Sequence, residues 1–81
     1  MTEDEILQRI THIVRDELDD DDITLTNGTV AKEVDGWDSL AHVRIVIAVE
    51  KAFKTRFEIV QITALESVGD LVRLVQKTVV V

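Results

Sequence analysis

The chain lacks several residue types on which other small proteins depend. It has no cysteine, no proline and no tyrosine, and only three glycines among its 81 residues. Without cysteine it forms no disulfide and offers no thiol as a nucleophile or metal ligand. It also has no apolar run long enough to span a bilayer. A chain of this length buries a limited core and has little room for a catalytic cleft, so we expect a single domain over residues 1–81.

Charge is distributed unevenly along the chain. Residues 1–38 hold twelve acidic and three basic side chains, a net charge of −9, whereas residues 39–81 carry +2, which gives −7 overall. An acidic surface repels nucleic-acid phosphates and anionic lipid and attracts basic protein partners. The opening Thr2-Glu3-Asp4-Glu5 is opposite in sign to a targeting segment. We therefore expect a cytoplasmic monomer that binds neither nucleic acid nor membrane.

Apolar residues recur at three- and four-residue spacing, which predicts an all-α fold. The first helix begins with the capping-box pattern of Thr2 and Glu5. The second has neither proline nor glycine between Leu40 and Phe53. Three longer helices and a short third one make a small four-helix bundle. The expected helices span about Thr2 to Glu17, Asp38 to Phe53 or Lys54, Gln61 to Leu65, and Ser67 onward, with Val79-Val80-Val81 extending the last helix or fraying.

A long acidic connection separates the first two helices. It opens with Asp19-Asp20-Asp21-Asp22, whose carboxylates oppose the dipole at the end of the first helix. The run is not an EF-hand loop, because the sixth position counted from Asp22 is Asn27 rather than glycine. We interpret it as a solvated acidic surface and predict no dedicated metal site, with loose binding of divalent ions by the clustered carboxylates as the alternative. Four apolar residues are expected to hold the connection against the core: Ile23, Leu25, Val30 and Val34.

The segment Gly36-Trp37-Asp38-Ser39-Leu40 places a serine where this connection becomes the second helix. Asp38 or Ser39 can cap the helix by accepting hydrogen bonds from N–H groups of the first turn. The positive end of the helix dipole also favours a phosphate attached to a serine at this place. Taken alone, the pattern is typical of ordinary helix capping.

The five residues and their setting resemble the acyl carrier protein family, which includes the peptidyl carrier domains and whose attachment motif reads G-x-D-S-L. Similar segments follow at Val49–Phe53, Phe57–Ile59 and Ser67–Val72, so the resemblance covers most of the chain. It implies a non-catalytic carrier with a four-helix bundle and a long loop between helices one and two. In that family the serine carries 4′-phosphopantetheine through a phosphodiester, and the thiol of the arm holds acyl or aminoacyl groups as thioesters.

The resemblance implies roles for individual residues. Ser39 is the expected attachment residue, with a phosphopantetheinyl transferase and the enzymes that load and transfer acyl groups as partners. Asp38 is expected to cap the helix and assist the transferase, and Leu40 completes the motif beside the arm. Trp37 is expected to pack against the core, with a contact to the arm as the alternative. His42 is expected to border the core rather than activate Ser39, because no orienting acid or oxyanion hole is evident.

The second helix has an apolar face on each side. At about 100° per residue, Leu40, Val43 and Ile47 fall within one sector, which we call the apolar strip. Arg44 flanks the strip, so we expect the strip to face solvent. Partners are expected to bind there through Leu40, Val43, Arg44 and Ile47. The alternative is a helix buried on both sides. The flanking cations also include Lys51 and Lys54, and the expected inward face consists of Ile45, Val46, Val49, Ala52 and Phe53.

The departures from the family pattern concern charge. Fatty-acid carriers of this family usually have acidic residues just after the motif and one turn later, where this chain has Ala41 and Arg44. This favours a carrier for a specialised pathway, such as one for polyketides, nonribosomal peptides or another modified acyl product. An aminoacyl or peptidyl carrier is the alternative within the family. An unmodified helical interaction module that uses the apolar strip is the alternative from another class.

Overall fold

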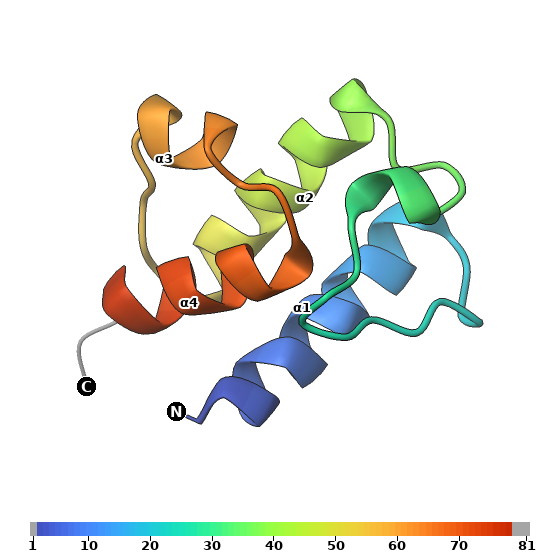
Figure 1. Cartoon of the computed structure of the whole chain (residues 1–81), viewed down its shortest axis with the longest axis horizontal. Coiled ribbons are helices and arrows are strands. Elements are labelled where there is room, and N and C mark those ends of the chain that lie inside the picture. Colours follow the sequence, from blue (N-terminus) through green and yellow to red (C-terminus); the bar gives the residue numbers. More distant parts are fainter. Residues whose placement is uncertain (1, 79–81) are drawn as a thin grey trace.

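The computed structural model describes residues 2–78, which form four α-helices and no strand (Figure 1). The predicted all-α bundle, with three longer helices and a short third one, is confirmed. A 3₁₀ helix, η1, lies within the long connection and was not predicted. The predicted extension or fraying over Val79–Val81 lies outside the described residues. The elements are α1 (Glu3–Leu18), η1 (Ala31–Glu33), α2 (Ser39–Ala52), α3 (Ile59–Thr63) and α4 (Val68–Thr78).

Reciprocal side-chain caps begin two of the helices. At α1 the Glu5 amide donates to Thr2 Oγ1 at 3.2 Å, and the Thr2 amide donates to Glu5 Oε1 at 3.1 Å. Before α4 the Asp70 amide donates to Ser67 Oγ and the Ser67 amide to Asp70 Oδ2, both at 3.3 Å. Each pair satisfies two N–H groups that have no partner within the helix. Both predicted starts are therefore confirmed.

The end of α1 is fixed by backbone hydrogen bonds. The Asp20 amide donates to the carbonyl of Arg15 at 3.0 Å, and the Asp19 amide donates to that of Asp16 at 3.3 Å. This Schellman pattern requires a left-handed residue, and Asp19 adopts φ 52° and ψ 47°. An aspartate thus occupies a position that glycine usually fills.

The core lies where α1 packs against both α2 and α4, and the long connection closes its remaining side (Figure 1). Ile23 and Leu25 of the connection are buried in the core and Val34 packs against it, as predicted. Val30 is half-buried. The Arg15 guanidinium donates to the Ile23 carbonyl at 2.7 Å. The largest fully buried side chains are Ile6, Ile10, Val14, Ile45, Val49, Val72 and Val75.

The connection is also joined to the start of α4. The amide of Val68 donates to the carbonyl of Thr29, and the amide of Gly69 donates to that of Asn27, both at 2.8 Å. A Cβ on Gly69 would lie 2.6 Å from the Asn27 carbonyl oxygen, so only glycine allows this approach. First-turn amides of α4 are thereby satisfied by the backbone of the connection.

Two detailed predictions were wrong. The third helix begins at Ile59 rather than Gln61, because the Glu58 amide donates to Gln61 Oε1 at 2.9 Å and Gln61 is thereby the third helical residue. Ala52, predicted to face the core, is exposed. It lies at the last position of α2, where an open groove separates it from α1.

Candidate functional site

Ser39 is the first residue of α2, and its side chain is exposed. Asp38 is the N-cap, since its Oδ1 accepts a hydrogen bond from the Ala41 amide at 2.8 Å. The His42 amide donates to the Asp38 carbonyl at 2.9 Å, which begins the helical ladder. The amides of Ser39 and Leu40 precede that ladder and have no partner within the helix. A helix start of this kind favours a phosphate group on Ser39.

A sharp turn directs the chain into this site. The Trp37 amide donates to the carbonyl of Val34 at 3.2 Å. Between them Gly36 adopts φ +86°, in the left-handed region that side-chain-bearing residues rarely occupy. The glycine of the motif is therefore required by backbone conformation. It allows Trp37 to turn inward while Ser39 stays at the surface.

Trp37 packs in the core and contacts the first turn of α2. Its Nε1 donates to His42 Nδ1 at 3.1 Å, and the two rings stack with centroids 6.1 Å apart. His42 is half-buried, and this burial lowers its pKa because the charged imidazolium loses hydration. Nδ1 of His42 is therefore engaged by Trp37. A contact between Trp37 and an arm stays a prediction.

An open groove of about 630 Å³ lies beside Ser39. A second space of about 30 Å³ is lined by Trp37 and His42 and by the segment before α4 together with Leu71. That inner space is large enough for about one water molecule and too small for a chain of several carbons. The site therefore offers an apolar surface next to Ser39 rather than an internal cavity. The apolar walls of the outer groove come from Ala31, Trp37, Val43, Ile62 and Leu65.

The apolar strip of α2 faces solvent. Leu40, Val43 and Ile47 are 67%, 53% and 45% exposed, whereas Ile45 on the opposite side is fully buried. The predicted exposure is confirmed, and the alternative of a helix buried on both sides is wrong. Arg44 beside the strip is exposed and lies 3.9 Å from a carboxylate oxygen of Glu17. The use of this surface by a partner stays a prediction.

Sequence reasoning missed two exposed apolar residues. Ile59 and Val60, the first residues of α3, are 78% and 74% exposed. A helix of five residues has too few turns for periodicity to show which side faces the core. The two side chains add apolar surface on α3, apart from the strip.

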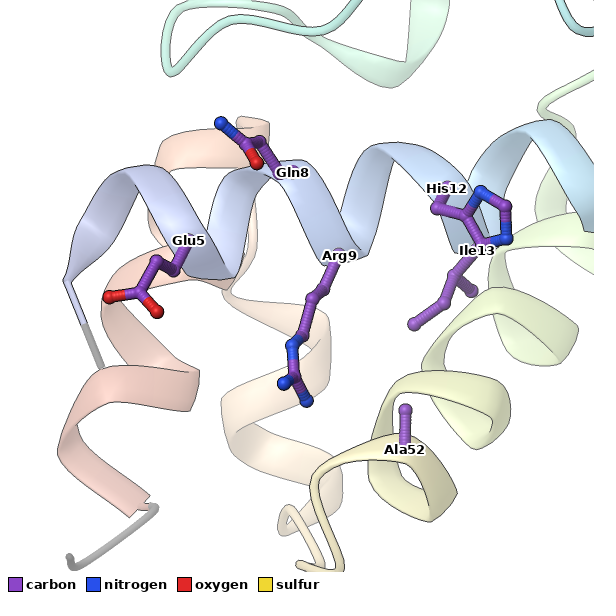
Figure 2. Close-up of a pocket in the computed structure, with 6 residues that line it drawn as sticks. All are labelled: Glu5, Gln8, Arg9, His12, Ile13 and Ala52. Atoms are coloured by element: carbon purple, nitrogen blue, oxygen red, sulfur yellow. The ribbon is translucent and has the colours of Figure 1, made fainter.

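A further open groove, of about 420 Å³, lies between α1 and the end of α2 (Figure 2). Arg9 extends across it and places its guanidinium carbon 5.8 Å from the ring centroid of Phe53, whereas Gln8 points away. Ala52 lines this groove and is at the opposite end of α2 from Ser39. The groove is thus separate from the attachment motif.

Residues 2–78 contain neither a membrane-spanning helix nor a metal-binding cluster. None of the helices there combines the length and apolarity needed to cross a membrane. In the same part of the chain, no three His, Asp or Glu side chains are grouped so that they would hold a metal ion.

Comparison with known proteins identifies the family. The chain is similar to the holo acyl carrier protein from Geobacter metallireducens, whose structure was determined in solution by NMR. The two share 40% sequence identity with a TM-score of 0.83, and the match covers 89% of this chain and 83% of the other. No protein-family model and no curated protein matches the chain. Acyl carrier proteins are carriers and not enzymes. With that identity over most of both chains, and with the serine of the G-x-D-S-L motif exposed at the start of α2, the chain belongs to the acyl carrier protein family.

Proposed function

We propose that this chain carries acyl groups as thioesters on a 4′-phosphopantetheine arm attached to the hydroxyl of Ser39. The observation that supports this function is the exposed position of Ser39 at the first residue of α2. The carboxylate of Asp38 is engaged by the Ala41 amide, which leaves the Ser39 hydroxyl accessible to a modifying enzyme. A phosphodiester on that hydroxyl would lie beside the unpartnered amides of Ser39 and Leu40.

The residues around Ser39 fit such an arm. When bound, the arm supplies the thiol that this cysteine-free chain lacks. Trp37 and Val43 form apolar walls of the groove that begins at Ser39, and Leu40 is exposed next to it. These side chains would border the arm and shield part of it from water without enclosing it. The bundle would act as a handle, and the reactive chemistry would belong to the arm.

The proposed partners are a phosphopantetheinyl transferase and the cytoplasmic enzymes that load and remove the acyl group. Leu40, Val43, Arg44 and Ile47 would form the surface that these enzymes contact, because this apolar strip is exposed and rimmed by charge. Ala41 is buried and offers no charge to a partner, and Arg44 offers a positive one. This pattern supports a carrier of a specialised pathway.

Coexpression with a broad-specificity phosphopantetheinyl transferase tests the carrier function. Mass spectrometry of the intact chain should show the addition of one arm, and Ser39→Ala should abolish it. Ser67→Ala is the matched control, since Ser67 is the chain's other serine and also precedes a helix. An unchanged mass of the wild type, with a transferase active on another carrier, would refute the proposal. Addition of an arm to the Ser39→Ala variant would show that the attachment site is another residue.

A further inference from the structure

The end of α2 farthest from Ser39 is positively charged, although the chain as a whole carries −7. Lys51, Lys54 and Arg56 are exposed there and line an open groove of about 570 Å³, which we call the cationic groove. Ile47 lines the same groove and also ends the apolar strip. The strip and the cationic groove therefore form one continuous surface.

The positive charge of the cationic groove is not neutralised within the part of the chain that the structure describes. The ion pairs within 4.0 Å among residues 2–78 join Arg44 to Glu17 and Arg73 to Asp70, and neither involves a cation of the groove. The one carboxylate that lines the groove belongs to Glu50. Its Oε2 accepts a hydrogen bond from the Phe57 amide at 2.8 Å, so it already holds the backbone after α2.

Helix stabilisation accounts for only part of this cluster. A cation in the last turn interacts favourably with the helix dipole, and Lys51 occupies that turn. The dipole effect fades within about one turn, so it still reaches Lys54, two residues after Ala52, but not Arg56, four residues after it. The charge of Arg56 thus has no role in the fold that the helix dipole explains.

We infer that the apolar strip and the cationic groove together dock a protein partner that presents carboxylates beside an apolar patch. The inference rests on the proposed carrier function and names the chemistry of its partner. The inferred partner is negatively charged at the contact. The net charge of the whole chain would instead be expected to attract a positively charged surface.

A compact acidic patch fits this surface better than an extended polyanion. The twelve acidic side chains of residues 1–38 would repel a membrane or a nucleic acid that spans the molecule. The 14 residues of α2 place its two ends about 20 Å apart, beyond the screening length of about 8 Å in physiological salt. Asp35 and Asp38, the acidic side chains next to Ser39 in the sequence, would therefore have little effect on carboxylates bound at the cationic groove.

Titration of the isotope-labelled full chain with designed peptides tests the inference by NMR. The probe is a synthetic amphipathic helix of about 18 residues with leucines along one face and glutamates beside them, and its matched control carries lysines instead. The glutamate peptide should shift the amide signals of Ile47, Lys51, Lys54 and Arg56, and added salt should weaken its binding. The lysine peptide should leave these signals unmoved at the same concentrations. Equal shifts with both peptides would overturn the inference.

Charge reversal locates the effect. Lys51→Glu should weaken binding of the glutamate peptide about two- to fivefold, the range of one exposed charge pair. Lys77→Glu is matched to it, because Lys77 is an exposed lysine in the last turn of α4, and should leave binding unchanged. Arg56→Glu lies outside the helices and should reproduce the loss without a helix-dipole cost. An equal loss in Lys77→Glu would show that only the net charge matters, against the inference.

Two further measurements complete the test. The first adds vesicles of phosphatidylglycerol or duplex DNA to the labelled chain. If either shifts the same signals at concentrations where the glutamate peptide does not, the surface binds a polyanion and the inference of an acidic protein partner is overturned. Transfer of the arm to Lys51→Glu by the transferase is measured in parallel. A wild-type chain that is modified normally but binds both peptides alike would refute the docking surface and leave the carrier function standing. A wild type that is never modified would refute the carrier function itself.

Discussion

Trp37 and His42 are joined by a hydrogen bond from the indole Nε1 to the imidazole Nδ1, 3.1 Å long, across the start of α2. The bond links the residue before the Asp38-Ser39 pair to the first turn that follows it. Nδ1 can accept only when it carries no proton, so the pair requires the neutral form of His42 with its proton on Nε2. Protonation of Nδ1 would place two donors face to face.

We expect this pair to make stability depend on pH. Burial lowers the pKa of His42 in the folded chain, so the folded state binds the proton less readily than the unfolded state. Its contribution is complete above the ordinary imidazole pKa of about 6.5 and is lost as the pH falls through the lower folded value. His42→Gln retains an acceptor without titrating in this range. Its melting temperature should therefore fall less than that of the wild type between about pH 7.5 and pH 5.

His12→Gln is the control for this experiment, because His12 is exposed on α1. It should keep the pH dependence of the wild type. Thermal melts recorded at several pH values give the comparison. Parallel curves for the wild type and His42→Gln would show that the Trp37–His42 bond does not control the acid sensitivity.

Two isoleucines of α2 should respond oppositely to truncation. Ile45 is fully buried and Ile47 is 45% exposed, although they are two residues apart. Ile45→Ala should lower the free energy of unfolding by about 2–5 kcal/mol through lost burial and a residual cavity. Ile47→Ala should cost less than about 1 kcal/mol and mainly weaken transfer to a partner enzyme. Denaturant unfolding checks the first effect and transfer kinetics the second. A large loss of stability in Ile47→Ala would place the strip in the core.

The contact between the connection and α4 predicts different effects at two glycines. Gly69→Ala puts a Cβ 2.6 Å from the Asn27 carbonyl oxygen, which must move, and should cost about 1–3 kcal/mol of stability. Gly28→Ala, one residue from Asn27, places its Cβ in open space and should change stability little. Amide hydrogen exchange at Val68 and Gly69 should accelerate in Gly69→Ala alone. Unaltered exchange there would mean that the connection adapts without losing its bonds.

Replacing the aspartate that ends α1 should stabilise the chain. Asp19 has a left-handed backbone that glycine adopts without strain, and it adds to a cluster of like charges. We expect Asp19→Gly to raise the free energy of unfolding by about 0.5–1 kcal/mol. Asp19→Asn removes the charge but keeps a side chain at the left-handed position. Asp21→Asn removes one charge of the same cluster from a residue without that backbone conformation. If Asp21→Asn stabilises as much as Asp19→Gly, repulsion rather than backbone strain is responsible.

The features that could be predicted from the sequence are those encoded within a few residues. The caps at Thr2 and Ser67 are local patterns, and the exposure of Leu40, Val43 and Ile47 follows from the period of a long helix. The start of α3 was missed, because Glu58 and Gln61 form a cap that lacks the usual serine, threonine or aspartate.

The features that were missed depend on how the chain returns on itself. The Trp37–His42 pair forms because Gly36 turns the indole back toward α2, and residue spacing alone does not show this turn. Ala52 was placed inward by its helical angle, yet no side chain from α1 covers it at the end of α2. The hydrogen bonds between the connection and α4 join residues about forty positions apart and have no local signature.

Those two backbone bonds make the placement of Ser39 a property of the whole chain. The attachment motif is complete within five residues, but the segment that leads to it is held by amides of Val68 and Gly69 near the other end. A fragment ending at residue 65 would contain the whole motif but would lack the two amides that hold the segment before it. An enzyme that modifies Ser39 only in this conformation would act on folded molecules in preference to partly folded ones. The extent of modification would then also measure the fraction of molecules in which α4 has folded.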